Sequence, residues 1–116
     1  LSHGAPLIDA LLGQALVATD DRAVAGEAVT LLKSAIQRDD GLPGAYVQLA
    51  MAYGRKGDLA EADLASAQAA AARGDIVTAR QLAARAKTRL PVGSPAWVRA
   101  DDITNLDPPK PSIFRR

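Results

Sequence analysis

Residues that could support acid–base or metal chemistry are few in this sequence, and their spacing does not suit it. A zinc site needs at least two ligands, such as histidines at positions i and i+4, and the chain has one histidine, His3. Adjacent acids occur at 20–21, 39–40 and 101–102. Neighbouring residues on a helix point about 100° apart, so such pairs cannot flank one bond as glycosidase carboxylates do. We interpret them as helix caps and solvated loop residues.

Nucleophilic and phosphate-binding patterns are equally weak. The chain has no cysteine, and none of its serines lies in a nucleophile-elbow pattern. The segment over 54–58, Gly-Arg-Lys-Gly-Asp, lacks the lysine-serine or lysine-threonine ending of a phosphate-binding loop. It also follows a predicted helix rather than a strand, which is typical of a helix end. The sequence therefore predicts a chain that is not an enzyme by itself and that holds no metal or cofactor.

The composition favours closely packed helices. Of the 116 residues, 48% are apolar but only 3% are aromatic, and alanine supplies much of the apolar content. Helices must then approach closely, which suits stacked helices rather than a β-sandwich. The length predicts a single domain. No apolar run comes near the roughly 20 residues of a membrane span, so we expect this part of the protein to be soluble.

Helical spacing and capping residues divide the chain into elements. Asp58 and Asp75 each follow a glycine and can cap a helix, and Ser94-Pro95 gives a cap followed by a proline in the first turn. The apolar stripe of the first helix consists of Leu7, Ile8, Leu11, Leu12 and Leu16. The pattern predicts helices over 7–19, 22–38, 44–56, 59–73, 76–90 and 95–105. The expected organisation is a flexible start over 1–5, a helical domain over 6–105 and a proline-rich tail over 106–116.

A glycine-aspartate pair recurs at a separation of seventeen residues, at 57–58 and 74–75. Seventeen is half the period of about 34 residues that marks tetratricopeptide repeats. Around the first pair the chain resembles that repeat through Tyr46, Leu49, Ala50, Tyr53, Gly57, Ala62 and Ala69. This resemblance implies an all-α superhelix of about six antiparallel helices, in which the helix over 59–73 both closes one unit and opens the next. We expect one continuous stack, with Ala50 and Ala62 at a helix contact and Trp97 covering the open end.

A repeat domain of this kind binds partners on the surface of its opening helices. Val47, Met51 and Arg55 form a ridge at spacings of four. It lies on the side away from Tyr46, Leu49 and Tyr53, which we expect to pack against the neighbouring helices. Exposed apolar side chains one turn apart suit an apolar peptide, and an arginine suits a carboxylate. The alternative is that these are ordinary exposed side chains. The predicted partner-binding residues are Gln14, Val17, Val47, Met51, Arg55 and Gln68.

A second candidate surface is basic. The net charge is only +1, but residues 73–99 hold six bases and one acid. The candidate cations are Arg80, Arg85, Lys87 and Arg89. Binding of single-stranded nucleic acid usually adds aromatic side chains between the charges, and these are lacking here. We therefore favour a solvated helix face, and we expect a protein or peptide partner rather than nucleic acid.

The second half of the chain resembles the C-terminal tetratricopeptide domain of bacterial periplasmic zinc metalloproteases. The most specific part is Gly93-Ser94-Pro95-x-Trp97, and Asp9 departs from the family pattern because an apolar residue usually opens the first helix. Further matching stretches are 12–16, 62–67, 73–75 and 99–103. The resemblance implies a periplasmic location and a preceding peptidase domain with a His-Glu-x-x-His zinc motif. Because the chain begins with Leu1, we expect it to be part of a longer protein.

The resulting functional hypothesis is a non-catalytic protein-interaction domain. By the resemblance, it would position substrates or outer-membrane assembly machinery for an envelope protease. The alternative is a free-standing scaffold or co-chaperone subunit of an envelope assembly, such as one for cytochrome maturation or secretion.

Overall fold

The computed structural model describes residues 6–17, 22–39 and 43–107. Within these ranges the chain is all-helical and contains no strand, as the sequence predicts. The helices are α1 (Pro6–Val17), α2 (Arg22–Arg38), α3 (Pro43–Lys56), α4 (Leu59–Ala72), α5 (Ile76–Lys87) and α6 (Pro95–Thr104). None of them is both long and apolar enough to cross a membrane. The expected flexible start over 1–5 and most of the expected tail lie outside the described residues.

The repeated glycine-aspartate pair forms two equivalent helix junctions. Gly74 has φ 82°, a left-handed conformation that glycine adopts without the steric cost of a Cβ. The next N–H, that of Asp75, donates to the Ala70 carbonyl at 2.9 Å and closes α4. The Asp75 carboxylate then accepts a hydrogen bond from the first turn of α5. Gly57-Asp58 repeats this arrangement between α3 and α4, so each pair ends one helix and starts the next.

Helix α5 ends earlier than the predicted residue 90. The Thr88 hydroxyl donates to the Arg85 carbonyl at 2.7 Å, and the Arg89 N–H donates to the Ala86 carbonyl in a tighter, i to i+3 pattern. Pro91 also disfavours helical geometry in the residue before it. The helix therefore ends at Lys87 and the chain turns before α6 begins.

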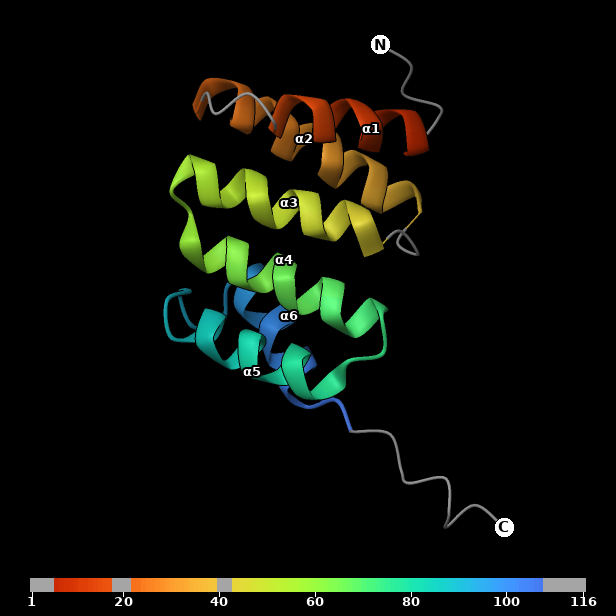
Figure 1. Ribbon diagram of the computed structural model, residues 1–116. Helices are drawn as coiled ribbons and strands as arrows, with labels where there is room; N and C mark the ends of the chain where they lie inside the picture. Colours follow the sequence, from red (N-terminus) through yellow and green to blue (C-terminus); the bar gives the residue numbers. More distant parts are fainter. Residues whose placement is uncertain (1–5, 18–21, 40–42, 108–116) are drawn as a thin grey trace, which may run out of the picture.

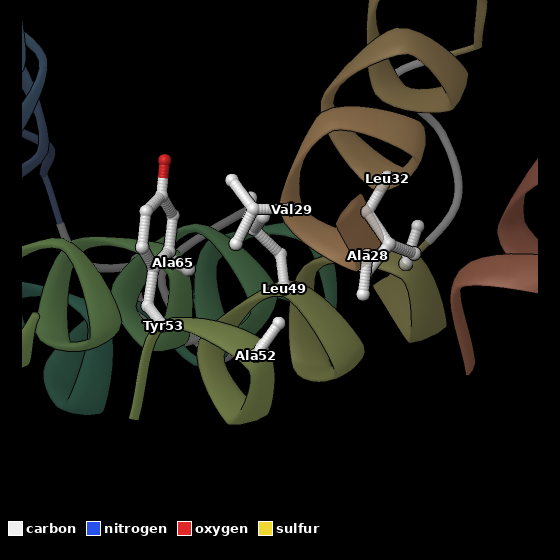
Figure 2. Packing of buried hydrophobic residues seen from close by; sticks show 8 residues of the cluster. Ala28, Val29, Leu32, Leu49, Ala52, Tyr53 and Ala65 are labelled. Carbon is white, nitrogen blue, oxygen red and sulfur yellow. The ribbon is translucent and has the colours of Figure 1, made fainter. Parts of the chain in front are cut away.

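The helices bury two separate apolar clusters. The N-terminal core lies mainly between α2 and α3 and consists of Ala28, Val29, Leu32, Ala45, Leu49, Ala52, Tyr53 and Ala65. Figure 2 shows Val29 and Leu49 of this core pointing toward each other where α2 crosses α3. The C-terminal core lies among α4, α5 and α6 and consists of Leu64, Ala67, Ala70, Ala79, Ala83, Ala86, Ala100 and Ile103.

The stack is interrupted at its middle, which corrects the expected continuous array. Helix α1 packs on α3, and α4 packs on α6, as successive units of a stack require. Between the described residues of α2 and α4, however, there is no close approach, and none between α3 and α5. Helix α4 thus packs against both α3 and α5, as predicted, but most of its buried apolar side chains belong to the C-terminal core. It commits Leu64, Ala67 and Ala70 to that core and gives the N-terminal core only Ala65 as a fully buried side chain.

As a result, the molecule consists of two three-helix halves joined through the antiparallel α3–α4 pair. In Figure 1, α2 and α6 both lie behind this pair, at opposite ends of the molecule. The side chains of α3 and α4 that lie between these two rear helices include Leu49, Leu64 and Ala65, which are buried.

Two predicted packing roles are only partly realised. Ala50 and Ala62 do pack against the N-terminal core, but both are half-buried, and Ala52 and Ala65 are the alanines fully enclosed there. Trp97 is also half-buried, with the Lys87 ammonium 4.8 Å from its ring centroid. Ala100 and Ile103 are the residues of α6 that enter the C-terminal core.

Helix α1 exposes three residues of its predicted apolar stripe, whereas Leu12 is half-buried and the side chain of Leu16 lies outside the described residues. Leu7, Ile8 and Leu11 are 62%, 56% and 57% exposed, whereas Asp9 is only 1% exposed. The Asp9 carboxylate forms an ion pair with Arg38 at the end of α2. A Cβ on Gly13 would meet Leu32 Cγ at 2.7 Å, so glycine allows α1 to lie directly against α2. Among the described side chains of α1, Asp9 and Gly13 are therefore the buried residues, and Leu12 is half-buried beside them.

Candidate partner-binding groove

A pocket of about 140 Å³ lies on the rear of the α3–α4 pair, between α2 and α6. We call it the α2–α6 groove. Its lining residues are Lys33, Ile36, Gln37, Tyr46, Leu49, Tyr53, Glu61, Leu64, Ala65, Gln68 and Arg99. It continues along α4 into a more open depression that shares Tyr46, Gln68 and Arg99 and adds Asp102 of α6. Helices α2, α3, α4 and α6 contribute residues to the groove.

The floor of the groove follows from helical periodicity in α3 and α4. Tyr46, Leu49 and Tyr53 are three and four residues apart and therefore share one face of α3. Leu64 and Gln68 share one face of α4 in the same way. Because α3 and α4 pack side by side, the two faces adjoin. The central side chains are apolar and buried, and Tyr46 and Gln68 are half-buried beside them.

Charged side chains stand at the edges of this floor. Lys33 of α2 and Arg99 of α6 are exposed, and they come from the two opposite walls. Glu61 of α4 is half-buried near the Gly57-Asp58 junction. The pocket thus has a cation on each wall and one acid on its floor, and its open continuation adds Asp102. Within the pocket itself, this charge distribution favours a ligand with a negative charge near apolar groups.

The phenol of Tyr53 in the groove titrates above its ordinary range. Burial raises the pKa of its phenol to about 12, and the negative charges of Glu61 and Asp58 act in the same direction. Arg99 lowers the pKa, so its positive charge reaches the phenol from the wall of the groove. In Figure 2 the Tyr53 hydroxyl points away from the ribbon of α3. Tyr53 therefore stays neutral at ordinary pH and offers a hydroxyl rather than a charge.

The groove combines polar, charged and apolar groups. The described residues contain no group of three or more His, Asp or Glu side chains that could hold a metal ion. In the same ranges, every buried side-chain nitrogen or oxygen has a hydrogen-bond partner. What the groove presents is a tyrosine hydroxyl, two cations and an apolar floor, which suits the recognition of a partner's side chains.

The structure does not bring the six predicted partner-binding residues into one site. Val47 and Met51 are exposed on α3, as the predicted ridge requires, and Arg55 is half-buried at the end of the same helix. Gln14 lines a separate depression between α1 and α3. Gln68 lies in the α2–α6 groove, on the opposite side of the α3–α4 pair. The side chain of Val17 lies outside the described residues.

The predicted basic face is largely neutralised by ion pairs. Arg85 donates two hydrogen bonds to Asp63, at 2.9 and 2.7 Å, and Arg89 lies 3.8 Å from the same carboxylate. The hydrogen bond and the charge of Asp63 raise the pKa of Arg85. Lys87 pairs with Asp101 at 2.6 Å. Three of the four cations are therefore engaged within the domain, which weakens the argument for a nucleic-acid surface.

The sequence interpretation missed the residues that form the walls of the groove. It assigned Tyr46 and Tyr53 to helix packing, and it considered neither Lys33 nor Arg99 as site residues. A usable signal was present, because each of the two predicted helices over 44–56 and 59–73 carries the side chains of the groove floor on one face. These two faces could have indicated a shared site. The contribution of α6 had no such signal, because it depends on how α6 folds back over α4.

Comparison with protein-family models, with curated proteins and with solved structures finds no match to this chain. The tetratricopeptide and metalloprotease resemblances therefore rest on the sequence motifs alone.

Proposed function

We propose that this domain binds a segment of another protein in the α2–α6 groove. The observation that carries the proposal is the apolar floor of Leu49, Leu64 and Ala65 between two walls that each hold an exposed cation. Small-molecule and cofactor sites usually enclose about 300–1,000 Å³. A pocket of about 140 Å³ is better matched to single side chains of an extended segment.

The preferred ligand is a segment with an apolar side chain next to a carboxylate. The apolar group would occupy the floor, and Lys33 and Arg99 would attract the carboxylate from either wall. Tyr46 and Gln68, which line both the pocket and its open continuation, can contact the backbone of a segment that runs along α4. A basic segment would meet the same two cations and bind less well.

The biological role that we propose follows the sequence resemblance. In a periplasmic zinc metalloprotease of the His-Glu-x-x-His type, the groove would position substrates or outer-membrane assembly proteins for a peptidase domain. The alternative role is a scaffold or co-chaperone subunit of an envelope assembly. The full-length sequence distinguishes the two, since only the first requires a His-Glu-x-x-His helix on the N-terminal side of Leu1.

A peptide titration followed by NMR tests the proposal. Peptides of equal length would carry leucine or phenylalanine beside glutamate, or beside lysine in the control set. We expect the acidic set to bind better and to shift the resonances of Leu49, Leu64 and Gln68. A charge-assisted hydrogen bond contributes about 1.5–3 kcal/mol, so Arg99→Ala should weaken binding at least about tenfold.

Arg80→Ala provides the matched control, because Arg80 lies on α5 in a separate depression. It removes the same charge from the domain without changing the groove. Equal loss of binding in both variants would indicate nonspecific attraction to a cation and would contradict the groove. Peptide-induced shifts confined to Val47 and Met51 would place the site on the predicted ridge of α3 instead.

A further inference from the structure

The charged side chains that line the α2–α6 groove form no ion pairs among the residues that the structure describes. Lys33 and Arg99 stand on the two walls of the pocket, and we call them the central cations. Glu61 lies on the floor of the pocket and Asp102 lines its open continuation, and we call them the outer acids. All four charges are therefore available to a segment bound in the groove.

Other acids on the same two helices are paired. Asp63 of α4 accepts hydrogen bonds from Arg85, and Asp101 of α6 accepts one from Lys87, so both acids are paired with α5. The outer acids are close neighbours of these two in the sequence but line the groove instead. The domain thus neutralises the acids that α4 and α6 direct toward α5 and leaves those that line the groove without a cation.

The charges follow an order along the groove. The residues of α4 that line it share one face of the helix and are Glu61, Leu64, Ala65, Gln68, Ala71 and Ala72. Glu61 lines only the pocket, Asp102 lines only the continuation, and Arg99 lines both, so a cation lies between the two acids. Lys33 faces the same pocket from the opposite wall. The order along α4 is therefore negative, positive and negative.

The length of α4 sets the length of a matching segment. From Glu61 at one end of the groove to Ala72 beside Asp102 at the other, the helix rises about 16 Å. An extended chain rises about 3.3 Å per residue, so about five residues cover this distance.

We infer that the groove binds an extended segment of about five residues in which an acidic residue is flanked on both sides by basic ones. The acidic residue lies between the central cations, the basic residues lie at the outer acids, and an apolar neighbour covers the floor. This inference rests on the proposed function, which requires only the apolar and acidic residues, and it adds the two basic ones. A segment that is acidic throughout is disfavoured, because its ends would face like charges.

Two capped peptides of identical composition test this order by NMR titration. One contains Lys-Leu-Glu-Ala-Lys, with the acid at the centre, and the other contains Glu-Leu-Lys-Ala-Lys, with the acid at one end, each between neutral glycine-serine flanks. Because their net charges are equal, nonspecific attraction contributes equally to both. We expect the first peptide to bind at least roughly fivefold more tightly, since the second places a lysine between the central cations.

Variants of the outer acids test each contact separately. Exchange of either lysine of the first peptide for glutamine should weaken its binding roughly twofold to fivefold, as expected for an exposed ion pair. Asp102→Asn should abolish the effect of one exchange and Glu61→Gln that of the other, and the pairing gives the direction of the bound segment. Glu27→Gln is the matched control and should abolish neither, because Glu27 is exposed on α2 and lines neither part of the groove.

The possible failures separate this inference from the proposed function. Equal binding of the two peptides, or the same loss of lysine dependence in Glu27→Gln, would overturn the charge order. If Arg99→Ala still weakened both peptides in that case, the proposed function would stand without the two basic residues. Binding of neither peptide would overturn both. Circular dichroism verifies that each variant is folded.

Discussion

The two halves of the molecule pack three helices each, but they fill their cores with different side chains. The N-terminal core contains Val29, Leu32, Leu49 and Tyr53 among smaller residues. The C-terminal core consists of six alanines with Leu64 and Ile103. The first half is therefore stabilised mainly by burial of large side chains, and the second by the close approach of smooth helices. We therefore expect the N-terminal half to lose most stability on large-to-small substitutions in its core. The C-terminal half should instead be sensitive to small-to-large substitutions.

The halves also differ in how they hold their buried acids. Asp9, in the first half, is almost fully buried and pairs with Arg38, whose side chain is 30% exposed. Asp63, in the second half, pairs with Arg85 and Arg89, whose side chains are 58% and 50% exposed. A carboxylate left alone in the first half would have less access to solvent, so the ion pair there should matter more for stability.

The largest expected effect is that of a large-to-small substitution in the N-terminal core. Leu32 is completely buried and contacts the α1 backbone at Gly13. Leu32→Ala should lower the free energy of unfolding by about 3–5 kcal/mol, because a cavity opens between α1, α2 and α3. Urea denaturation measures the loss. A change below about 1 kcal/mol would show that α1 and α2 are not packed as described.

The next effect concerns the buried acid of the first half. Arg38→Met leaves Asp9 buried without its partner and should cost about 2–4 kcal/mol, somewhat less than for a fully enclosed pair because Arg38 is partly exposed. The double variant with Asp9→Leu should recover most of the loss. A double-mutant cycle measures the coupling. Replacing Arg85, a partner of Asp63, should lower the free energy of unfolding by less than Arg38→Met does. A larger loss on replacing Arg85 would contradict the comparison of the two ion pairs.

A small-to-large substitution should mainly damage the second half. Ala83 is fully buried in the C-terminal core between tightly packed helices. Ala83→Leu should cost about 1–3 kcal/mol through overpacking. The half-buried Ala50, at the edge of the N-terminal core, provides the matched control, and Ala50→Leu should cost less. Thermal unfolding of both variants measures the difference. Equal costs would mean that the two halves tolerate added volume alike.

The smallest effect is the pH dependence from Tyr53. Its pKa in the folded protein is about 12, above the ordinary tyrosine value of 10.0. A raised pKa means that the folded state favours the neutral phenol, so this contribution is fully present below pH 10 and is lost as the pH rises toward 12. We expect a loss of about 2 kcal/mol across this window that is absent in Tyr53→Phe. Urea denaturation at several pH values measures it, and the two proteins behaving alike would contradict the burial of the phenol.

Much of the fold could be predicted because its determinants are local. The Gly57-Asp58 and Gly74-Asp75 pairs specify helix ends through a left-handed glycine and a capping carboxylate, and both act within a few residues. The candidate site could be predicted only in part. The stripe of Tyr46, Leu49 and Tyr53 was recognised, but as packing, because nothing local indicates that α2 leaves it partly uncovered.

The sequence by itself therefore determined the helices, their order and their junctions, since these follow from spacing, caps and backbone conformation. Only the tertiary structure decided that Asp9 points inward while Leu7 and Leu11 point outward, because that choice depends on Arg38 and Leu32 of another helix. It also decided that, among the described residues, α2 does not approach α4 and α3 does not approach α5, so that the two halves are joined through the α3–α4 pair alone. A half-repeat spacing is compatible with either packing, and the choice depends on which neighbours cover the alanine-rich surface of α4.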